Sequence, residues 1–397
     1  MSALFNLFYI YDPWFFHFLR MAFVTGIIVL VYLSYQMYKK QLVGGITVPL
    51  DSLVAIMALL LVSVLPLLIN GSEDYAVLLM YCKSLLLFIF GIGIYHLFYS
   101  KQGGKQQFIR DLEIGIIVQA VFGFLALCGI SFIIDFLLST NIVLPRFYGS
   151  EQEYRLYNIT SSAFFQLSAF YLILLHFLLA YNEKENKISS IYLLLILFIG
   201  VISGRTFFIF SILSIMLYFK RRYIPVLVVF IAIVLFLAKF YPENRYIAHA
   251  LEPVINLLSN TGNSIDSLSD ISSSTDTLVQ KHLFIPEVKQ LIIGDGYYFT
   301  EDKRYYGGSD SGFIRQVLYG GVGYSLVCLI FTWYFVRKIS VNWFENSWKF
   351  TYSTLFILSV LNIKADTYAF PGIMFVLIMF LSLFGTNGKN IVLFKRD

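Results

Sequence analysis

The sequence predicts an all-α, polytopic membrane protein with about 11–12 transmembrane helices and one long exterior loop that contains short helices. Three observations support this fold class. Hydrophobic residues make up 58% of the 397 residues and charged residues only 13%, whereas a soluble chain is about 25% charged. The apolar residues gather in segments of about 20, the length that crosses a bilayer. The charged residues lie mainly between these segments, which excludes a soluble enzyme, a disordered chain and a nucleic-acid-binding protein.

Eleven segments are apolar enough to be candidate spans. They cover residues 18–38, 50–69, 76–99, 114–134, 161–181, 188–202, 204–219, 223–240, 313–336, 348–364 and 367–385. A twelfth candidate, residues 2–16, is broken by Asp12 and Pro13. It is therefore either a short span or a helix that lies in the membrane interface.

The spans divide the chain into three parts. Residues 1–240 form an N-terminal group of transmembrane helices, including a short hairpin at 188–219. Residues 241–312 form the long loop, and residues 313–397 form a C-terminal group of helices with a cytoplasmic tail. No repeat of two similar halves is visible in the sequence, which argues against a transporter built from inverted repeats.

Lysine and arginine lie mainly in alternate loops, and this bias predicts the orientation of the chain. Sixteen of the 29 basic residues belong to one set of loops. They are Lys39, Lys40, Lys101, Lys105, Arg110, Lys184, Lys187, Lys220, Arg221, Arg222, Arg337, Lys338, Lys349, Lys389, Lys395 and Arg396. The opposite short loops hold only Arg146, Arg155, Arg205 and Lys364. The first set of loops and the C-terminus are therefore expected in the cytoplasm. We slightly prefer twelve spans to eleven, and an even number would place the N-terminus in the cytoplasm as well.

The long loop is the most polar part of the chain. It contains ten of the 24 acidic residues, from Glu243 to Asp310. Residues 246–258 carry apolar side chains at helical spacing and predict a helix along the membrane surface. Residues 263–278 are rich in Ser and Asp and predict a turn followed by a short helix.

Ionisable side chains near the apolar layer are expensive, so those at exterior helix ends are the first candidates for a functional site. Arg205 lies at the tip of a hairpin whose two spans have only about 15 residues each. Such short spans place the tip within the membrane thickness. There Arg205 either contacts a lipid phosphate or only anchors the hairpin by extending its charge to the headgroups.

A second candidate site lies where the long loop enters the next span. Ser309, Asp310 and Ser311 are good N-cap residues, and Arg315 follows one turn inside the helix. A helix N-terminus with free N–H groups and an arginine on its first turn suits a phosphate. Asp310 is either a proton acceptor in catalysis or a capping residue that pairs with Arg315.

Two further loops carry candidate residues. Arg146, Glu151, Glu153 and Arg155 lie beside aromatic residues just before a span, a mixture that suits sugar binding and equally suits a solvated loop. Lys364 occupies an exterior turn with Asp366, where it either contacts the same phosphate or forms a surface ion pair.

No cofactor site is expected. The histidines of the long loop, His249 and His282, lack the HExxH or paired Cys/His spacing of a zinc site. The sequence contains no P-loop, dinucleotide fingerprint or GxSxG motif. Neither a metal nor a nucleotide is therefore predicted.

These features resemble the Wzy-type polymerases that assemble O-antigen and related bacterial surface polysaccharides. The resemblance rests on SGRTFF around Arg205, on the long loop, and on the sequence at its end, where GDGYY at 294–298 is followed by SDSGFIRQVLYGGVGYS at 309–325. It covers the architecture of nearly the whole chain, with the matching residues concentrated at 291–325. Arg304 and Gly320 also fit an arginine–glycine spacing noted in some members.

The resemblance implies a glycosyltransferase of lipopolysaccharide biosynthesis on the periplasmic face of the bacterial inner membrane. Such enzymes move a growing glycan from undecaprenyl diphosphate to the non-reducing end of a new lipid-linked repeat unit. The implied partners are undecaprenyl-diphosphate-linked oligosaccharide, membrane lipid, a chain-length regulator and a flippase. Related O-antigen ligases share the architecture and use a histidine of the long loop, which His249 and His282 match only loosely.

The chemistry suggests roles for the candidate residues. The leaving diphosphate develops negative charge as the glycosidic bond breaks, so fixed arginines stabilise the transition state; this is the role expected of Arg205 and Arg315. Asp310, or in second place Glu153, is expected to take the proton of the acceptor hydroxyl. The residues expected to bind substrate are Arg146, Arg155, Arg304, Lys364, Tyr305 and Tyr306.

Two other classes remain as alternatives. A flippase or other transporter of lipid-linked oligosaccharide predicts ionisable residues in the middle of several spans, whereas the charges here cluster at the exterior rim and in the long loop. A non-catalytic membrane scaffold is the second alternative.

Overall fold

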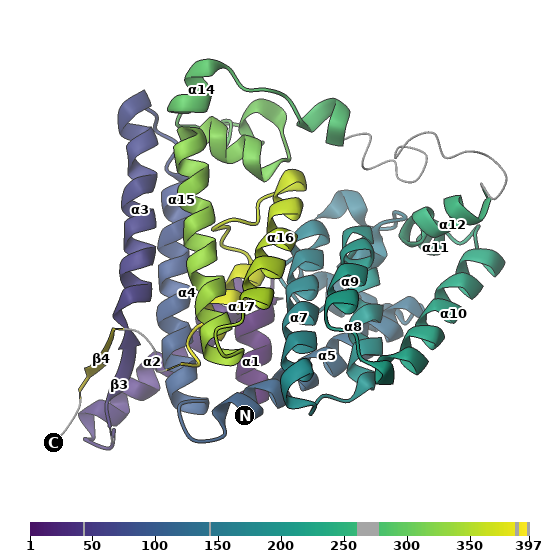
Figure 1. Cartoon of the computed structure of the whole chain (residues 1–397), viewed down its shortest axis with the longest axis horizontal. Coiled ribbons are helices and arrows are strands. Elements are labelled where there is room, and N and C mark those ends of the chain that lie inside the picture. Colours follow the sequence, from purple (N-terminus) through teal and green to yellow (C-terminus); the bar gives the residue numbers. More distant parts are fainter. Residues whose placement is uncertain (43, 143, 260–277, 386–388, 395–397) are drawn as a thin grey trace. The chain divides into compact units, whose positions relative to one another are not determined.

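The computed structural model describes residues 1–42, 44–142, 144–259, 278–385 and 389–394. Most of these residues are helical (Figure 1), which agrees with the predicted class of an α-helical, polytopic membrane protein. Within the described residues, six segments are long and apolar enough to cross a membrane. They are α2 (Met21–Tyr38), α3 (Leu50–Asn70), α4 (Ala76–Phe98), α7 (Phe164–Glu185), residues Arg221–Phe240 with α10 (Ile224–Phe240), and α15 (Gly312–Trp343). The total of about 11–12 spans remains a prediction.

Four shorter apolar helices accompany them: α1 (Ser2–Tyr11), α6 (Ser131–Thr140), α8 (Ser190–Ser203) and α9 (Arg205–Leu217). Helix α1 covers only part of the candidate span 2–16, because the chain turns at Asp12 with a φ of 47°. Its ten residues rise about 15 Å, half of the roughly 30 Å hydrocarbon core. Helix α1 therefore does not cross the membrane by itself.

Two other candidate spans differ from the helices observed. The predicted span 114–134 is divided between α5 (Gly104–Leu127) and α6, because the chain turns at Gly129 with a φ of 80°. The last candidate, 367–385, contains only the nine-residue helix α17 (Ile373–Leu381). Hydropathy located these segments, but backbone turns between equally apolar neighbours define where their helices begin and end.

Two small sheets depart from a purely helical fold. Strand β1 (Trp14–Phe15) pairs with β2 (Leu19–Arg20), and β3 (Ile46–Pro49) pairs in antiparallel register with β4 (Asn390–Leu393). Strands of two to four residues are too short to show the alternation that marks a strand in a sequence. Pairing with a distant segment, rather than local pattern, determines β3 and β4.

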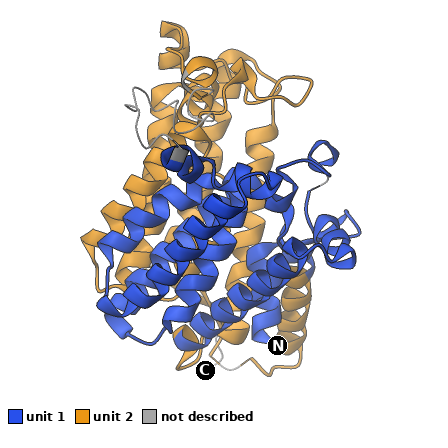
Figure 2. Ribbon diagram, turned by 90° about the vertical axis from the view of Figure 1, so that its right-hand side faces the viewer, with its two compact units in different colours: residues 1–24, 106–276 blue, residues 25–105, 277–397 orange. Residues whose placement is uncertain are grey.

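The helices form two compact units, and each unit contains two separate parts of the chain (Figure 2). Unit 1 comprises residues 1–24 and 106–276, and unit 2 comprises residues 25–105 and 277–397. The predicted boundaries at 240 and 312 divide the chain by its expected membrane topology, which these contacts do not test. Residues 260–277, which include most of the Ser- and Asp-rich stretch predicted as a turn and helix, lie outside the described residues.

Helix α7 is the centre of unit 1. It packs against α8 and α9, and every residue from Leu167 to Asn182 is buried. A helix that is apolar on all sides is expected in such a fully surrounded position. The loop between α6 and α7 folds back onto α5, because the Gln119 side chain donates to the Ile159 carbonyl and accepts from its N–H, both at 2.8 Å.

The long loop begins with two helices that belong to unit 1. The helical spacing predicted for residues 246–258 is confirmed by α11 (Arg245–Ala250) and α12 (Glu252–Ser259). Leu251, between them, packs against Val234 and Ala238 of α10. The loop therefore returns to the helices that precede it.

Unit 2 is organised around α15. Helix α3 packs against α4 and α15, while α14 (Val288–Ile292) and α16 (Trp348–Lys364) also pack on α15 (Figure 1). Helix α15 is broken at Gly320 and Gly321, and Gly321 has a φ of 76° that favours glycine. The carbonyls of Leu318 and Tyr319 accept the N–H groups of Asp295 and Gly296 at 2.7 and 3.0 Å. The GDG sequence at 294–296 is thereby docked onto the break.

Candidate functional site

Two clusters bring the predicted arginines together with residues distant in sequence. The Arg205 cluster, in unit 1, contains Arg205, Glu252, His249, Tyr154 and Arg155. The Arg315 cluster, in unit 2, contains Arg315, Asp366, Tyr298, Tyr305 and Asp310.

Arg205 occupies the tip of the hairpin between α8 and α9, as predicted. It follows Gly204, which has a φ of 155°; a Cβ there would lie 2.8 Å from Arg155 Nη2 and from Ser168 Oγ, so a larger residue would displace these side chains. The Arg205 guanidinium forms an ion pair with Glu252 of α12, and its Nη2 lies 3.5 Å from His249 Nε2. The hairpin tip and the long loop therefore form one site.

His249 is neutral in this arrangement. Because arginine only donates hydrogen bonds, Nε2 of His249 must accept from Arg205. The proton then resides on Nδ1, which lies 2.9 Å from the Tyr154 hydroxyl. Burial and the positive charges of Arg205 and Arg155 lower the pKa of His249 to about 4. The ring thus orients Arg205 without adding charge at neutral pH.

Arg155 supplies a second positive charge beside Arg205. Its Nε donates to the Ser203 carbonyl at 3.2 Å, and its guanidinium lies 4.5 Å from the centre of the Phe164 ring. Burial lowers the pKa of Arg155 to about 10; Tyr154 opposes this shift and the charge of Arg205 adds to it. Arg205 is paired with the Glu252 carboxylate, and the negative charge of Glu151 also acts on it. The Arg205 cluster therefore holds two neighbouring guanidinium groups, which suit an anionic ligand that replaces these carboxylates.

The other candidates of this loop stabilise the loop itself. Glu153 is buried and accepts hydrogen bonds from the Tyr157 hydroxyl, at 2.6 Å, and from the Gly149 N–H. Arg146 lies over the Phe147 ring, 4.6 Å from its centre. These contacts favour a structural role for Glu153, which was the second choice as proton acceptor.

Arg315 lies on the first turn of α15, as predicted, but it is buried rather than open. The side chain of Arg315 is 3% exposed and that of Asp366 is 1% exposed. Nη2 of Arg315 donates to an Asp366 carboxylate oxygen and to the Asp310 carbonyl, both at 2.9 Å. The Tyr305 ring covers the guanidinium at 3.7 Å.

Two donor atoms of Arg315 remain unused. Nε and Nη1 are buried and make no well-aligned hydrogen bond within the part of the chain that the structure describes; the Tyr305 side chain is a further polar group beside the guanidinium, in addition to Asp366 and the Asp310 carbonyl. An unsatisfied buried donor costs about 1–3 kcal/mol. Acceptor oxygens of an anionic ligand would remove this cost, which makes these two atoms the clearest indication of a ligand in unit 2.

Asp366 is the partner of Arg315 that the sequence did not single out. In the turn after α16, the sequence predicted Lys364 as the phosphate-binding residue. The residue of this turn that contacts Arg315 is Asp366, which also accepts a hydrogen bond from the Tyr298 hydroxyl. Lys364 is the last residue of α16. The presence of Asp366 in the same short turn was the only available signal, because a carboxylate 51 positions from Arg315 shows no local pattern.

Asp310 contacts Arg315 through its backbone, whereas its carboxylate points elsewhere. This carboxylate is 57% exposed and one oxygen lies 3.5 Å from His282 Nε2. The Asp310 N–H donates to His282 Nδ1 at 3.1 Å. Ser311 is the N-cap residue of α15, in agreement with the sequence, but its side chain makes no cap hydrogen bond. Ser309 Oγ accepts the Ser311 N–H at 3.1 Å and donates to the His282 carbonyl at 2.6 Å.

The remaining substrate-binding candidates lie on the loop above Arg315. The Tyr305 ring stacks on Phe299, with ring centres 5.5 Å apart. The Tyr306 hydroxyl donates to Asp295 at 3.1 Å, and the Arg304 side chain is exposed. Tyr305 is thus the substrate-binding candidate of this loop that contacts the buried arginine, at 3.7 Å, and the Tyr298 ring lies 5.9 Å from the same guanidinium.

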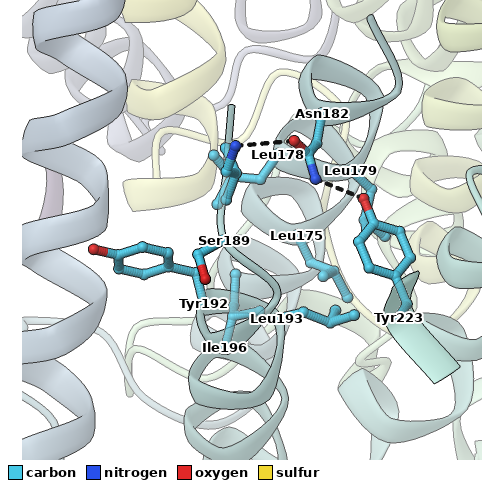
Figure 3. A pocket seen from close by; sticks show the side chains of 10 residues that line it. Leu175, Leu178, Leu179, Asn182, Ser189, Tyr192, Leu193, Ile196 and Tyr223 are labelled. Atoms are coloured by element: carbon cyan, nitrogen blue, oxygen red, sulfur yellow. Dashed lines mark hydrogen bonds between the residues drawn. The ribbon is translucent and has the colours of Figure 1, made fainter. Parts of the chain in front are cut away.

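A small pocket in unit 1 lies apart from both clusters. It is lined mainly by residues of α7 and α8, and the Asn182 side chain donates to the Tyr223 hydroxyl at 2.7 Å (Figure 3). Its volume of about 20 Å³ holds roughly one water molecule. It lies at the beginning of α8, whereas Arg205 follows the end of that helix, so it does not form part of the candidate site.

Comparisons with family models, curated proteins and solved structures found no match to this chain. The resemblance to Wzy-type polymerases therefore rests on the residues and architecture described above. No group of three or more His, Cys, Asp or Glu side chains suited to a metal ion occurs within the described residues.

Proposed function

We propose that this protein is an O-antigen or surface-polysaccharide polymerase of the Wzy type, acting on the periplasmic face of the bacterial inner membrane. The observation that carries the proposal is the state of Arg315. It is a buried arginine beside a helix N-terminus, with two donors unused and an aromatic ring stacked on it. A diphosphate supplies the charge and the acceptor oxygens that such a group requires.

The reaction transfers a glycan between two lipid-linked molecules. The bond between the anomeric carbon and the diphosphate oxygen breaks, and a bond to the acceptor hydroxyl forms while that hydroxyl loses its proton. Negative charge develops on the leaving diphosphate, where Arg315, already oriented by Asp366, stabilises it. The exposed carboxylate of Asp310 is the proton acceptor in this scheme.

The Arg205 cluster is a candidate anion site in its own right. Its two neighbouring guanidinium groups, of Arg205 and Arg155, suit the diphosphate of a lipid-linked substrate. The ion pair with Glu252 is partly exposed, with side-chain exposures of 17% and 26%. An incoming phosphate can therefore replace Glu252 as the partner of Arg205.

Purified protein in lipid nanodiscs, incubated with undecaprenyl-diphosphate-linked repeat units, tests the proposal. A ladder of glycans that grow by one repeat unit is the expected result. Repeat units that remain unchanged with the purified wild-type protein, and also in a membrane extract of the producing cells, would refute a polymerase.

One observation favours a ligase as the second candidate. Both histidines of the long loop lie at the clusters, His249 against Arg205 and His282 against Asp310. A ligase would transfer the glycan to an acceptor that carries no polyprenyl diphosphate. Supplying a lipid A–core acceptor with the lipid-linked glycan separates the two activities, because a single transfer without a ladder indicates a ligase.

A further inference from the structure

A carboxylate from the turn between α3 and α4 holds the loop that carries Tyr298. Asp74 accepts hydrogen bonds from the backbone N–H of Tyr298 at 2.6 Å and of Phe299 at 2.9 Å. Its other oxygen accepts from the N–H of Ala76 at the beginning of α4, at 3.1 Å. One side chain thus joins the beginning of α4 to a loop 224 positions away.

The same loop is also held by the break in α15. The N–H groups of Asp295 and Gly296 donate to carbonyls released by that break, and Ser72 Oγ donates to the Gly296 carbonyl at 2.7 Å. A Cβ on Gly294 would lie 2.5 Å from the backbone of Tyr319 and Gly320. The loop is therefore packed too closely to shift while these contacts persist.

Tyr298 transmits this position to the ion pair. Its hydroxyl donates to Asp366, which pairs with Arg315 at 2.9 Å. Tyr298 is 5% exposed, so all three side chains are enclosed. Asp74 fixes the backbone of Tyr298, Tyr298 fixes Asp366, and Asp366 fixes the guanidinium.

We propose that Asp74 is a positioning residue for Arg315, acting through Tyr298 and Asp366. Its effect on catalysis rests on the proposed function, whereas its effect on the position of Arg315 does not. A misplacement of about 1 Å in a catalytic group can cost on the order of 100-fold in rate. Asp74 has no contact with the guanidinium itself, so its influence must pass through the loop.

The test measures the environment of Arg315 separately from activity. Phenylglyoxal modifies accessible guanidinium groups, and mass spectrometry of the purified, full-length protein reports modification at Arg315, with exposed Arg304 as the internal reference. Asp74→Ala should raise the rate at Arg315 on the order of tenfold by releasing the loop. Asp74→Asn should stay closer to the wild-type rate than Asp74→Ala, because its amide oxygen can accept the N–H groups of Tyr298 and Phe299 and only the bond from the Ala76 N–H is lost. Glu73→Ala, at the exposed neighbouring position, is the matched control.

Turnover provides the second measurement. Asp74→Ala should lower kcat by about 10- to 100-fold with a smaller change in KM, and Asp74→Asn should restore it. Tyr298→Phe removes only the hydroxyl and should also raise the modification rate at Arg315. This second variant keeps the test available if Asp74→Ala does not fold.

Unchanged Arg315 modification in both Asp74→Ala and Tyr298→Phe would overturn the positioning role, and so would an Asp74→Asn variant as altered as Asp74→Ala. A wild-type protein that makes no polymer would refute the proposed function alone, because the modification of Arg315 is measured without substrate.

Discussion

The Arg205 and Arg315 clusters use the same side chain in different environments. Arg205 and Glu252 are partly exposed, at 17% and 26%, whereas Arg315 and Asp366 are almost fully enclosed, at 3% and 1%. A partly exposed ion pair contributes little to stability and exchanges partners readily. A buried pair is held firmly, because removing either partner leaves an uncompensated charge.

The clusters also differ in what they offer a ligand. The Arg205 cluster holds two neighbouring arginines and a neutral His249, and its ion pair with Glu252 is partly open to solvent. The Arg315 cluster holds one enclosed arginine with two donor atoms that make no hydrogen bond within the described residues. The comparison suggests that the first captures an anion, whereas the second orients one in the transition state.

The largest expected effect is a loss of turnover when lysine replaces one of the two arginines. This substitution keeps the positive charge but removes the planar guanidinium group. Arg315→Lys should lower kcat by about 10²- to 10³-fold, because one ammonium cannot keep Asp366 and also present fixed donors. Arg205→Lys should lower kcat less and mainly raise KM. Steady-state kinetics with lipid-linked repeat units measures both. Equal losses of kcat would remove the distinction between the clusters.

The next effect is on stability. Asp366→Ala should destabilise the protein by about 3–5 kcal/mol, because it leaves Arg315 buried without its carboxylate. Glu252→Ala, the matching change in the other cluster, should cost less than about 1 kcal/mol. Thermal unfolding in detergent compares the two variants at the same scan rate. A larger loss of stability in Glu252→Ala than in Asp366→Ala would contradict the view that Arg315–Asp366 is the firmly held pair and Arg205–Glu252 the exchangeable one.

A smaller effect is expected from the break that shapes the Arg315 cluster. Gly321 has a φ of 76° and a ψ of 179°, and a Cβ there would lie 2.4 Å from the Ile292 carbonyl oxygen. Gly321→Ala should therefore cost about 1–3 kcal/mol. Gly323→Ala is the control, since no atom lies within 4 Å of its Cβ position, and it should be neutral or stabilise by up to about 1 kcal/mol. An equal fall of the unfolding temperature in Gly321→Ala and Gly323→Ala would show that the break in α15 does not contribute to stability.

The smallest effect is a pH dependence confined to the Arg205 cluster. The pKa of His249 is about 4 in the folded protein and about 6.5 in an unfolded chain. The unfolded state therefore binds more protons between these values, and stability falls as the pH falls from about 6.5 to about 4. The loss is at most about 3 kcal/mol and is reduced by solvent screening, because the ring is only partly buried.

His249→Gln should flatten this dependence, since glutamine retains polar groups but does not titrate. Unfolding temperature measured from pH 7 to pH 4 tests it, with His282→Gln as the control. An unchanged pH profile in His249→Gln would show that His249 is not the titrating group.

Much of the fold follows from hydropathy. The segments that became α2, α3, α4, α7 and α10 were located within a few residues, because a stretch of about 20 apolar residues has few alternatives in a membrane protein. Arg205 and Arg315 were also found, since a charge beside an apolar helix end is conspicuous. The division between α5 and α6 was missed because both sides of Gly129 are equally apolar.

The partners of the two arginines were beyond such reasoning. Glu252 and His249 lie 47 and 44 positions from Arg205, and Asp366 lies 51 positions from Arg315. Asp74 reaches Tyr298 across 224 positions. Hydropathy reports only which solvent surrounds a segment, and helices that are apolar on all sides carry no pattern that says which neighbour they contact. The amino-acid order therefore establishes a membrane protein with charged helix ends. The packing of its helices and loops leaves the ion pair of Arg205 partly exposed and encloses that of Arg315. Only the tertiary structure decides this difference, because burial and pairing depend on contacts between distant segments.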